Sequence, residues 1–302
     1  MSAPAFPPES GLCHPLSDRL AMVLAPNPSP MTGPGTNTFL VGTDELAIID
    51  PGPADNTHLT ALIKAINGRP VKAIIVTHSH LDHSPLAHPL SDAIDAPVYG
   101  FGGALAGQSD VMARLRDAGM SGGGEGVDVG FTPDHLVKDG DVLQGAGWTL
   151  EVAHTPGHMG NHIALHWGDV AFVGDLIMGW STSLVSSPDG DMGDFLRSCK
   201  SLRERHCRVL YPAHGAPIID PDARITEVIT HRQGRNAAIL DVLRKGPHDV
   251  AAIVQAVYTG LAPALAGAAA RNVFAHLVEM HQRGEVTATP HLAPDATFHL
   301  RR

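Results

Sequence analysis

The sequence predicts an α/β fold in the larger part of the chain, followed by a small domain of mixed helix and strand. Short apolar runs rich in β-branched residues, such as Val71–Val76, alternate with amphipathic helical patterns. Beyond Ile219 alanine becomes abundant, and three helical patterns precede two short strand patterns. We therefore place one domain at residues 1–220 and a second at residues 221–302.

Length and composition are those of a globular protein without membrane spans. The 302 residues are 43% hydrophobic and 17% charged, enough for a sizeable core. No run of about 18 apolar residues occurs, and the first residues lack the basic and apolar regions of a signal peptide, so we expect a cytoplasmic protein with no membrane partner. Three cysteines without a CxxC spacing indicate a reducing compartment and argue against a cysteine-based zinc site.

The net charge of −10 is unevenly distributed. Residues 232–302 carry eight basic and five acidic side chains, a surplus of +3, so the rest of the chain carries −13. An acidic body is expected where divalent cations bind, because metal is not part of the formal charge. A surplus of +3 is small for a nucleic-acid-binding domain.

The elements of the larger domain follow from apolar runs that end at Gly, Pro, Asn or Asp and from helical spacing of apolar residues. Strands are predicted at residues 18–25, 38–41, 45–50, 71–76, 96–101, 148–153, 162–167, 169–173 and 208–211. Helices are predicted at residues 56–67 and 191–205, with a further short helix before residue 96. The strands at 162–167 and 169–173 are close enough in the chain to form a hairpin.

The strand at 71–76 leads into a cluster of metal-type ligands. His78, His80, Asp82 and His83 fall within six residues. Neutral imidazole and carboxylate both suit zinc, and a strand end is a rigid platform for such side chains. Without a cation these groups would be poorly compensated beside an apolar strand, which is costly. The pattern therefore favours a metal site over a histidine-rich surface loop.

Three further strands end in the same kind of residue. His158 follows the strand at 148–153 after the tight turn Pro156-Gly157, Asp175 follows 169–173, and His214 follows 208–211. A single histidine of this kind is usually structural. Four strand ends that all deliver metal-type ligands predict one common site.

Several nearby residues have two interpretations. Asp50 either orients a ligand histidine or is a turn residue before Pro51. Trp180–Ser183 either line a substrate pocket or anchor a loop. The strand position of His162 favours packing over ligation, and His154 remains ambiguous.

Residues 102–130 differ in kind from the rest of this domain, because they include nine glycines. We interpret the segment as a loop, because at least its second half cannot be a well-packed element. It is either a mobile flap over the site or a solvent-exposed insertion.

The C-terminal region has its own order of elements. Helices are predicted at residues 222–244 and 248–257 and within 263–283, and a hairpin is predicted from 285–289 and 297–300. Three helices and a hairpin in this order resemble a winged helix.

In order and approximate spacing, the ligand-type residues resemble the full ligand set of the metallo-β-lactamase superfamily. The resemblance covers roughly residues 18–220 and implies an αββα sandwich, in which two face-to-face β-sheets carry helices outside and a binuclear metal site at one edge. It also implies that His78, His80 and His158 hold the first metal, that Asp82, His83 and His214 hold the second, and that Asp175 bridges both.

With its tail, the chain looks like the branch of that superfamily that includes the β-lactamase-like protein 2 group. Residues 27–32 and 35–38 and the pair His231-Arg232 add to this likeness. The animal member of the group is a mitochondrial endoribonuclease, but fold and branch do not fix a substrate.

The implied site predicts hydrolysis. Three imidazoles leave a zinc ion with an open position, and two cations can share a water that ionises near neutral pH. The resulting hydroxide attacks a carbonyl or phosphorus, and either Asp82, a candidate catalytic residue, or a metal-bound water hands a proton to the leaving group. Two zinc ions per chain are expected, with iron or manganese as alternatives.

A bridging Asp175 points away from β-lactam hydrolysis, and the complete second-metal set points away from one-iron sulfur dioxygenases.

Three functions are weighed on this basis. The first is a hydrolase of a small-molecule ester, thioester or lactone, in which the winged helix dimerises the protein or walls the pocket. The second is an endoribonuclease or phosphodiesterase on single-stranded RNA, against which stands an aromatic content of only 5%. The third is a non-catalytic DNA-binding protein that uses the winged helix, against which stands the complete ligand set.

Overall fold

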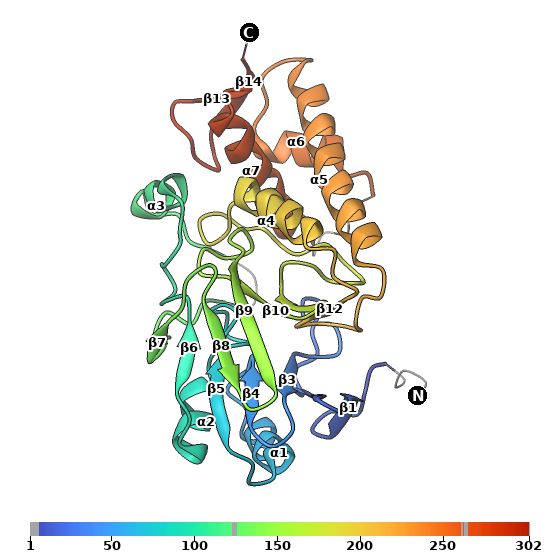
Figure 1. Ribbon diagram of the computed structural model, residues 1–302. Helices are drawn as coiled ribbons and strands as arrows, with labels where there is room; N and C mark the ends of the chain where they lie inside the picture. The colour runs from blue at the N-terminus through green and yellow to red at the C-terminus, as the bar shows by residue number, and fades with distance from the viewer. Residues whose placement is uncertain (1–5, 123–125, 261, 263–264, 302) are drawn as a thin grey trace.

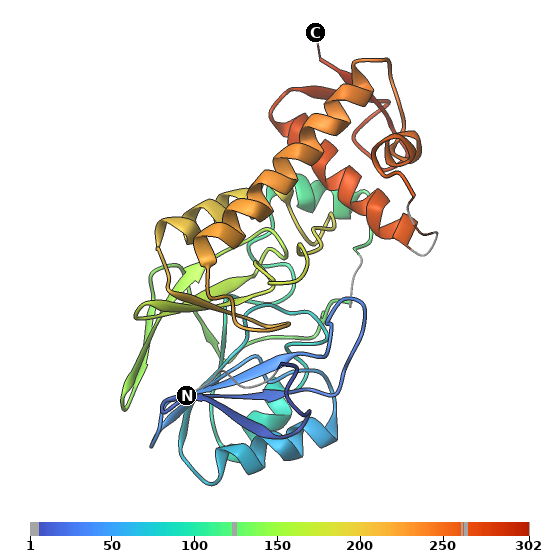
Figure 2. The same ribbon diagram turned by 90° about the vertical axis from the view of Figure 1, so that its right-hand side faces the viewer.

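The computed structural model describes residues 6–122, 126–260, 262 and 265–301. Two β-sheets pack face to face, helices cover both outer faces, and the C-terminal helices form a further body beyond the second sheet (Figures 1 and 2). The predicted αββα sandwich with a small α+β domain after it is therefore confirmed. Among the described residues, no helix combines the length and the apolar composition needed to cross a membrane.

The first sheet contains seven strands in the order of the chain. They are β1 (Cys13–Ser17), β2 (Leu20–Leu24), β3 (Asn37–Val41), β4 (Leu46–Ile49), β5 (Val71–Ile75), β6 (Val98–Gly100) and β7 (His135–Leu136). Neighbours from β1 to β4 are antiparallel, and neighbours from β4 to β7 are parallel. The strands β1 and β7 were not predicted, because they are short and too exposed to carry an apolar run.

The second sheet contains five strands in the spatial order β12, β11, β10, β9, β8. They are β8 (Val142–Gly145), β9 (Trp148–His154), β10 (Ile163–Trp167), β11 (Val170–Gly174) and β12 (Val209–Pro212). The predicted hairpin is confirmed, since β10 and β11 pair antiparallel with Leu165 opposite Phe172. Parallel pairing of β11 with β12 brings the residues that follow these two strands to the same edge.

Apolar cores join the layers. One core lies between the sheets and includes Phe39, Ile75, Leu150 and Phe172. The helices α1 (Asn56–Ile66) and α2 (Ala87–Ile94) cover the outer face of the first sheet, and α4 (Met192–Glu204) covers the second. The ends of α1 follow the sequence signals: Asp55 caps its N-terminus and Asn67 adopts the left-handed conformation at its C-terminus.

The C-terminal region contains the predicted three helices and hairpin. They are α5 (Pro221–Leu243), α6 (Val250–Val257), α7 (Ala266–Gln282), β13 (Val286–Thr289) and β14 (Thr297–Leu300). The hairpin pairs antiparallel, with Val286 opposite Leu300. A separate apolar core, which includes Ile239, Ile253, Phe274 and Phe298, holds this body together.

The glycine-rich segment departs from its prediction in its first half. Residues Asp110–Asp117 form the helix α3, and Val111, Met112 and Leu115 are buried in the core of the C-terminal region. Apolar residues at helical spacing therefore outweigh the glycines on either side. The glycines at 123 and 124 lie outside the described residues, and 126–134 contain no helix.

Candidate metal centre

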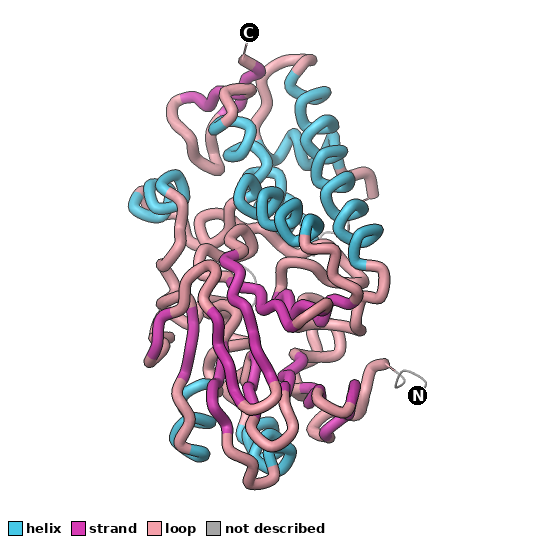
Figure 3. The backbone as a smooth tube through the Cα atoms, in the orientation of Figure 1, coloured by secondary structure: helices cyan, strands magenta, loops and turns pink. Residues whose placement is uncertain are grey.

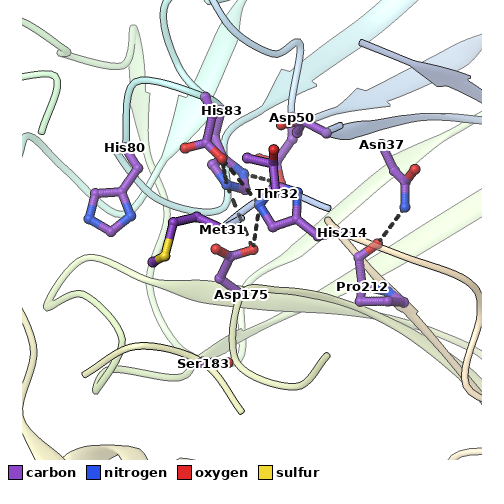
Figure 4. Close-up of polar contacts among 12 residues, drawn as sticks. Met31, Thr32, Asn37, Asp50, His80, His83, Asp175, Ser183, Pro212 and His214 are labelled. Carbon is purple, nitrogen blue, oxygen red and sulfur yellow. Dashed lines mark hydrogen bonds and ion pairs between the residues drawn. The ribbon is translucent and has the colours of Figure 1, made fainter. Parts of the chain in front are cut away.

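The seven predicted ligands meet at one point, although they come from four separate loops. His78, His80, Asp82 and His83 follow β5, His158 follows β9, Asp175 follows β11, and His214 follows β12. Figure 3 shows loops gathered between the strands of the two sheets and the C-terminal helices, and Figure 4 shows His83, Asp175 and His214 facing one another in this region. Each of the seven side chains is at least nine-tenths buried.

Three histidines form the first group of potential ligands. The Nδ1 atom of His80 lies 3.0 Å from the Nε2 atom of His78 and 3.0 Å from the Nε2 atom of His158. Ring nitrogens of all three lie within 4.8 Å of one another, so one cation could contact all three. This is the set predicted for the first metal.

Two histidines and an aspartate form the second group. The Oδ2 atom of Asp82 lies 3.3 Å from the Nε2 atom of His83 and 3.1 Å from the Nε2 atom of His214. These atoms again lie within 4.8 Å of one another. This is the set predicted for the second metal.

Asp175 lies between the two groups. Its Oδ2 atom is 3.5 Å from the Nε2 atom of His158, and its Oδ1 atom is 3.7 Å from that of His83 and 3.3 Å from that of His214. One carboxylate oxygen therefore faces each group. That geometry matches the bridging position implied for Asp175.

The chemistry of these residues fits metal ions. Buried polar atoms normally have hydrogen-bond partners. Within the described chain, Nε2 of His83, Oδ2 of Asp82 and Oδ1 of Asp175 face the ligand groups and form no hydrogen bond of regular geometry. Cations would satisfy these nitrogen and oxygen atoms, and histidine with carboxylate is a common ligand set for zinc.

Hydrogen bonds on the far side of the His83, His158 and His214 rings fix their orientation. His83 donates from Nδ1 to Oδ2 of Asp50 at 3.1 Å, and Asp50 also accepts hydrogen bonds from the N–H and hydroxyl of Thr77. His158 donates from Nδ1 to the carbonyl of Leu184 at 2.7 Å. Such partners select the tautomer that leaves Nε2 free for a metal.

His214 and the strand before it are fixed in the same way. Nδ1 of His214 donates to the carbonyl of Gly35 at 3.2 Å. The side-chain amide of Asn37 donates to the carbonyl of Pro212 at 3.0 Å (Figure 4) and to that of Gly215 at 2.9 Å. The N-terminal loop therefore holds the end of β12 against the site.

The electrostatics of the two groups differ. Burial is the main cause that lowers the pKa of His80 to about 3 and holds the pKa of His78 well below its usual value, so both rings are neutral, as ligation requires. Burial also lowers the pKa of His214, but the carboxylate charge of Asp175 and hydrogen bonds to Asp175 and Asp82 outweigh it and raise that pKa to about 10. Without a cation the His214 ring is therefore protonated, and binding of a metal ion at the second group would displace this proton.

The residues left open by the sequence now have defined contacts. Asp50 is 2% exposed and accepts a hydrogen bond from His83. A residue that only formed the turn before Pro51 would not need this contact. Nε2 of His162 accepts a hydrogen bond from the N–H of Asp175, and its Nδ1 lies 2.8 Å from the hydroxyl of Thr155. Both ring nitrogens are therefore occupied, which favours a packing role over metal ligation. His154 stacks on Phe101 and contacts the Gly160 carbonyl, away from the ligand groups.

The space among the ligands is small. It measures about 30 Å³, enough for a water molecule or ion, and Met31, Met178 and Leu184 form its apolar wall. Sequence reasoning did not find these three residues, because nothing in their local pattern marks them. A larger cavity of about 840 Å³ lies between α3 and the C-terminal region and contains none of the seven ligands, so ligand chemistry rather than volume identifies the site.

An αββα sandwich with buried histidines and aspartates at the converging ends of its strands defines a metal-dependent hydrolase. The chain belongs to the metallo-beta-lactamase superfamily, whose family model matches residues 31–214. The model of the beta-lactamase associated winged helix domain matches residues 250–291. Both parts of the resemblance noted in the sequence are confirmed.

Curated relatives agree with this assignment. A beta-lactamase-like protein 2 homolog from Caenorhabditis elegans is 30% identical over 76% of this chain and 72% of that protein. An atrochrysone carboxyl ACP thioesterase from Aspergillus fumigatus is 28% identical over 76% of this chain and 66% of that protein.

Solved structures share the fold over nearly the whole chain. A metallo-beta-lactamase family protein from Thermus thermophilus is 25% identical, with a TM-score of 0.74 over 95% of this chain and 100% of that chain. A beta-lactamase domain protein from Burkholderia ambifaria is 22% identical, with a TM-score of 0.78 over 97% of this chain and 94% of that chain.

Proposed function

We propose that this protein is a binuclear, zinc-dependent hydrolase of small-molecule thioesters, with esters and lactones as related substrates. The observation that carries the proposal is the position of Asp175, which presents one oxygen to each of two complete ligand groups. A centre with two groups and a shared carboxylate is suited to two ions rather than one.

The side chains have distinct parts in this proposal. When bound, the two ions would lower the pKa of a shared water and polarise the oxygen of the electrophile. Burial raises the pKa of Asp82, but the charge of His83 and hydrogen bonds from His214 and His83 hold it well below its usual value, so its carboxylate is ionised. A carboxylate of such low pKa is a weak base, so the part of Asp82 in this proposal is to orient the attacking water, and the proton of that water goes to the leaving group.

The lining of the site supports a neutral acyl substrate over a polyanion. Among the described residues around the cavity, none is lysine or arginine, and the side chains beyond the ligands include Met31, Met178 and Leu184. Phosphate recognition normally uses basic side chains. The name of the fungal relative, a thioesterase, points the same way.

The C-terminal region supports RNA or DNA binding less well. Of its basic residues, Arg232 is buried, and Arg244 and Arg283 form ion pairs with Asp241 and with Glu279 and Glu285. These side chains are not free to form a basic stripe on the surface. RNA hydrolysis and duplex DNA binding are therefore outcomes of the test rather than the proposal.

A substrate panel tests the proposal. The zinc-loaded protein is assayed with an acyl N-acetylcysteamine thioester, a lactone, an aryl ester, a bis-aryl phosphodiester and single-stranded RNA. We expect the thioester to be hydrolysed with the highest kcat/KM. Efficient cleavage of RNA with no thioester hydrolysis would overturn the proposal, as would tight, sequence-selective binding to duplex DNA by a protein that hydrolyses none of the panel.

A further inference from the structure

We infer that a cavity beside the metal centre, walled by Trp180, binds the acyl group of the substrate, and that this group is aromatic or of medium chain length. The inference deepens the proposed thioester hydrolysis and rests on it. It concerns the part of the substrate that does not react, and thus the specificity of the enzyme rather than its chemistry.

Trp180 is an exposed aromatic residue held in a fixed place. Its side chain is 48% exposed, unlike Trp148, which is 3% exposed. The indole lies against two glycines: a Cβ atom on Gly215 would lie 2.8 Å from its Cδ1 atom, and a Cβ atom on Gly33 would lie 3.4 Å from its Cζ2 atom. Both glycines have positive φ, and Gly215 directly follows the ligand His214. The ring is thus seated next to the metal centre.

A cavity of about 160 Å³ separates Trp180 from the ligands. Its apolar walls are Pro30, Met31, Met178, Trp180 and Leu184. Met31, Met178 and Leu184 also wall the 30 Å³ space among the ligands, so the two cavities adjoin. Methionine side chains are flexible and can move to connect them.

Two polar side chains that line this cavity, those of Arg232 and Asn272, are hydrogen-bonded to other groups. Arg232 donates from Nη1 to Oδ1 of Asn272 at 2.7 Å and from Nη2 to the carbonyl of Ser183. The amide of Asn272 donates to the hydroxyl of Tyr258 at 3.0 Å. Nε of Arg232 has no partner among the described residues, but both terminal nitrogens of its guanidinium are occupied, so the wall available to an acyl group is formed mainly by the five apolar side chains.

Volume and lining together define the ligand class. An apolar cavity of about 150 Å³ holds a benzene ring, and the partly open cavity beside the exposed Trp180 has a similar volume. An acyl group of that size, such as benzoyl or hexanoyl, fits the cavity while its carbonyl carbon lies at the metal centre. Trp180 also lines a second hollow of about 640 Å³, which includes Phe6 and the exposed Ile219 and offers a path for entry.

The first arm of the test is a kinetic series. Acetyl, hexanoyl and benzoyl N-acetylcysteamine thioesters are compared on the wild-type enzyme and on Trp180→Ala and Trp180→Phe. Each buried methylene contributes up to about fourfold in binding. We expect wild-type kcat/KM to be at least about tenfold higher for hexanoyl than for acetyl, and Trp180→Ala to lose about tenfold on hexanoyl and benzoyl but less than about twofold on acetyl. Trp180→Phe should retain most of the preference.

The second arm measures binding without catalysis. Tryptophan fluorescence of the zinc-loaded protein is recorded during titration with hexanoate, benzoate and acetate. We expect a blue shift with hexanoate and benzoate only, retained in Trp167→Phe and absent in Trp180→Phe. Thermal unfolding of each variant verifies its fold.

The two arms separate the inference from the proposed function. Thioester hydrolysis in which Trp180→Ala loses the same factor on acetyl and hexanoyl substrates would overturn the acyl site and leave the function standing. If no thioester is hydrolysed but hexanoate still causes a fluorescence shift that depends on Trp180, the proposed thioesterase function is wrong and the acyl-binding cavity is supported.

Discussion

At the scale of single residues, the site depends on contacts that lie behind the ligands. Asp50 is the clearest case, because it joins the loop after β4 to the ligand loop after β5. It accepts hydrogen bonds from both the N–H and the hydroxyl of Thr77 and from the ring of His83. A carboxylate in this position fixes the ring and increases its basicity as a ligand.

We expect Asp50→Asn to weaken zinc binding by about 10- to 100-fold, because the amide keeps the shape but loses the charge that faces His83. Competition with a fluorescent chelator gives the affinity. Asp55→Asn is the matched control, since Asp55 caps α1 in the same loop and does not contact a ligand. Equal zinc affinities of wild type and Asp50→Asn would show that Asp50 is only a turn residue.

The identity of the ligands could be predicted from the sequence, whereas the residues around them could not. His78 and His214 each follow an apolar strand, and that pattern is local. Met31, Met178 and Leu184 meet only through the tertiary fold, and no period or motif links them. The same holds for Gly33 and Gly215, whose shared contact is Trp180.

At the scale of elements, α5 and α7 hold the loop that orients His158. Arg232 of α5 is 2% exposed, packs its guanidinium 5.3 Å from the centre of the Phe195 ring and donates to the carbonyl of Ser183. The neighbouring carbonyl, that of Leu184, accepts from His158. Burial lowers the pKa of Arg232 to about 10, so it remains charged at neutral pH.

Replacement of Arg232 by methionine should therefore affect both stability and the metal centre. The carbonyl of Ser183 and Oδ1 of Asn272 would lose a donor, at a cost of about 1–3 kcal/mol each. We expect urea unfolding to show a free energy of unfolding lower by about 2–4 kcal/mol. Zinc affinity should also fall, because the loop that contains Leu184 would no longer hold His158 in place. Arg244→Met, at the C-cap of the same helix and in an exposed ion pair, should change stability by no more than about 1 kcal/mol. Losses of the same size in both variants would contradict this role.

Elements with a strong local signal were predicted well, and elements made by distant packing were not. The helix α1 was found because its caps and apolar face lie within the segment itself. The helix α3 was missed because its apolar side chains pack on α6 and α7, more than a hundred residues away in the chain. Its glycine-rich surroundings hid a short amphipathic pattern.

At the scale of the whole molecule, buried neutral histidines make stability depend on pH. Burial outweighs the charge of Asp55 and lowers the pKa of His58 to about 4, and burial lowers the pKa of His276 well below its usual value. Both rings stay neutral in the folded protein, but they take up protons once unfolded below about pH 6.5. Their contribution to stability is therefore complete above pH 6.5 and is lost as the pH falls from 6.5 toward 4.

We expect His276→Gln to flatten this dependence. His276 donates to the side-chain oxygen of Asn236 at 2.6 Å, a bond that the glutamine amide can replace. Between pH 6.5 and 4, the free energy of unfolding of the variant should fall less steeply than that of wild type, by up to about 1.4 kcal/mol per pH unit. Urea unfolding at a series of pH values gives both slopes, and parallel curves would contradict the prediction.

The central claim is that seven side chains from four loops hold two metal ions. It is tested most directly by measuring the metal content of the purified, zinc-loaded protein by mass spectrometry, beside Asp175→Ala and the exposed control His88→Ala. The account predicts two zinc ions per chain for wild type and for His88→Ala, and no more than one for Asp175→Ala. One ion per wild-type chain, or no change on removal of Asp175, would contradict it.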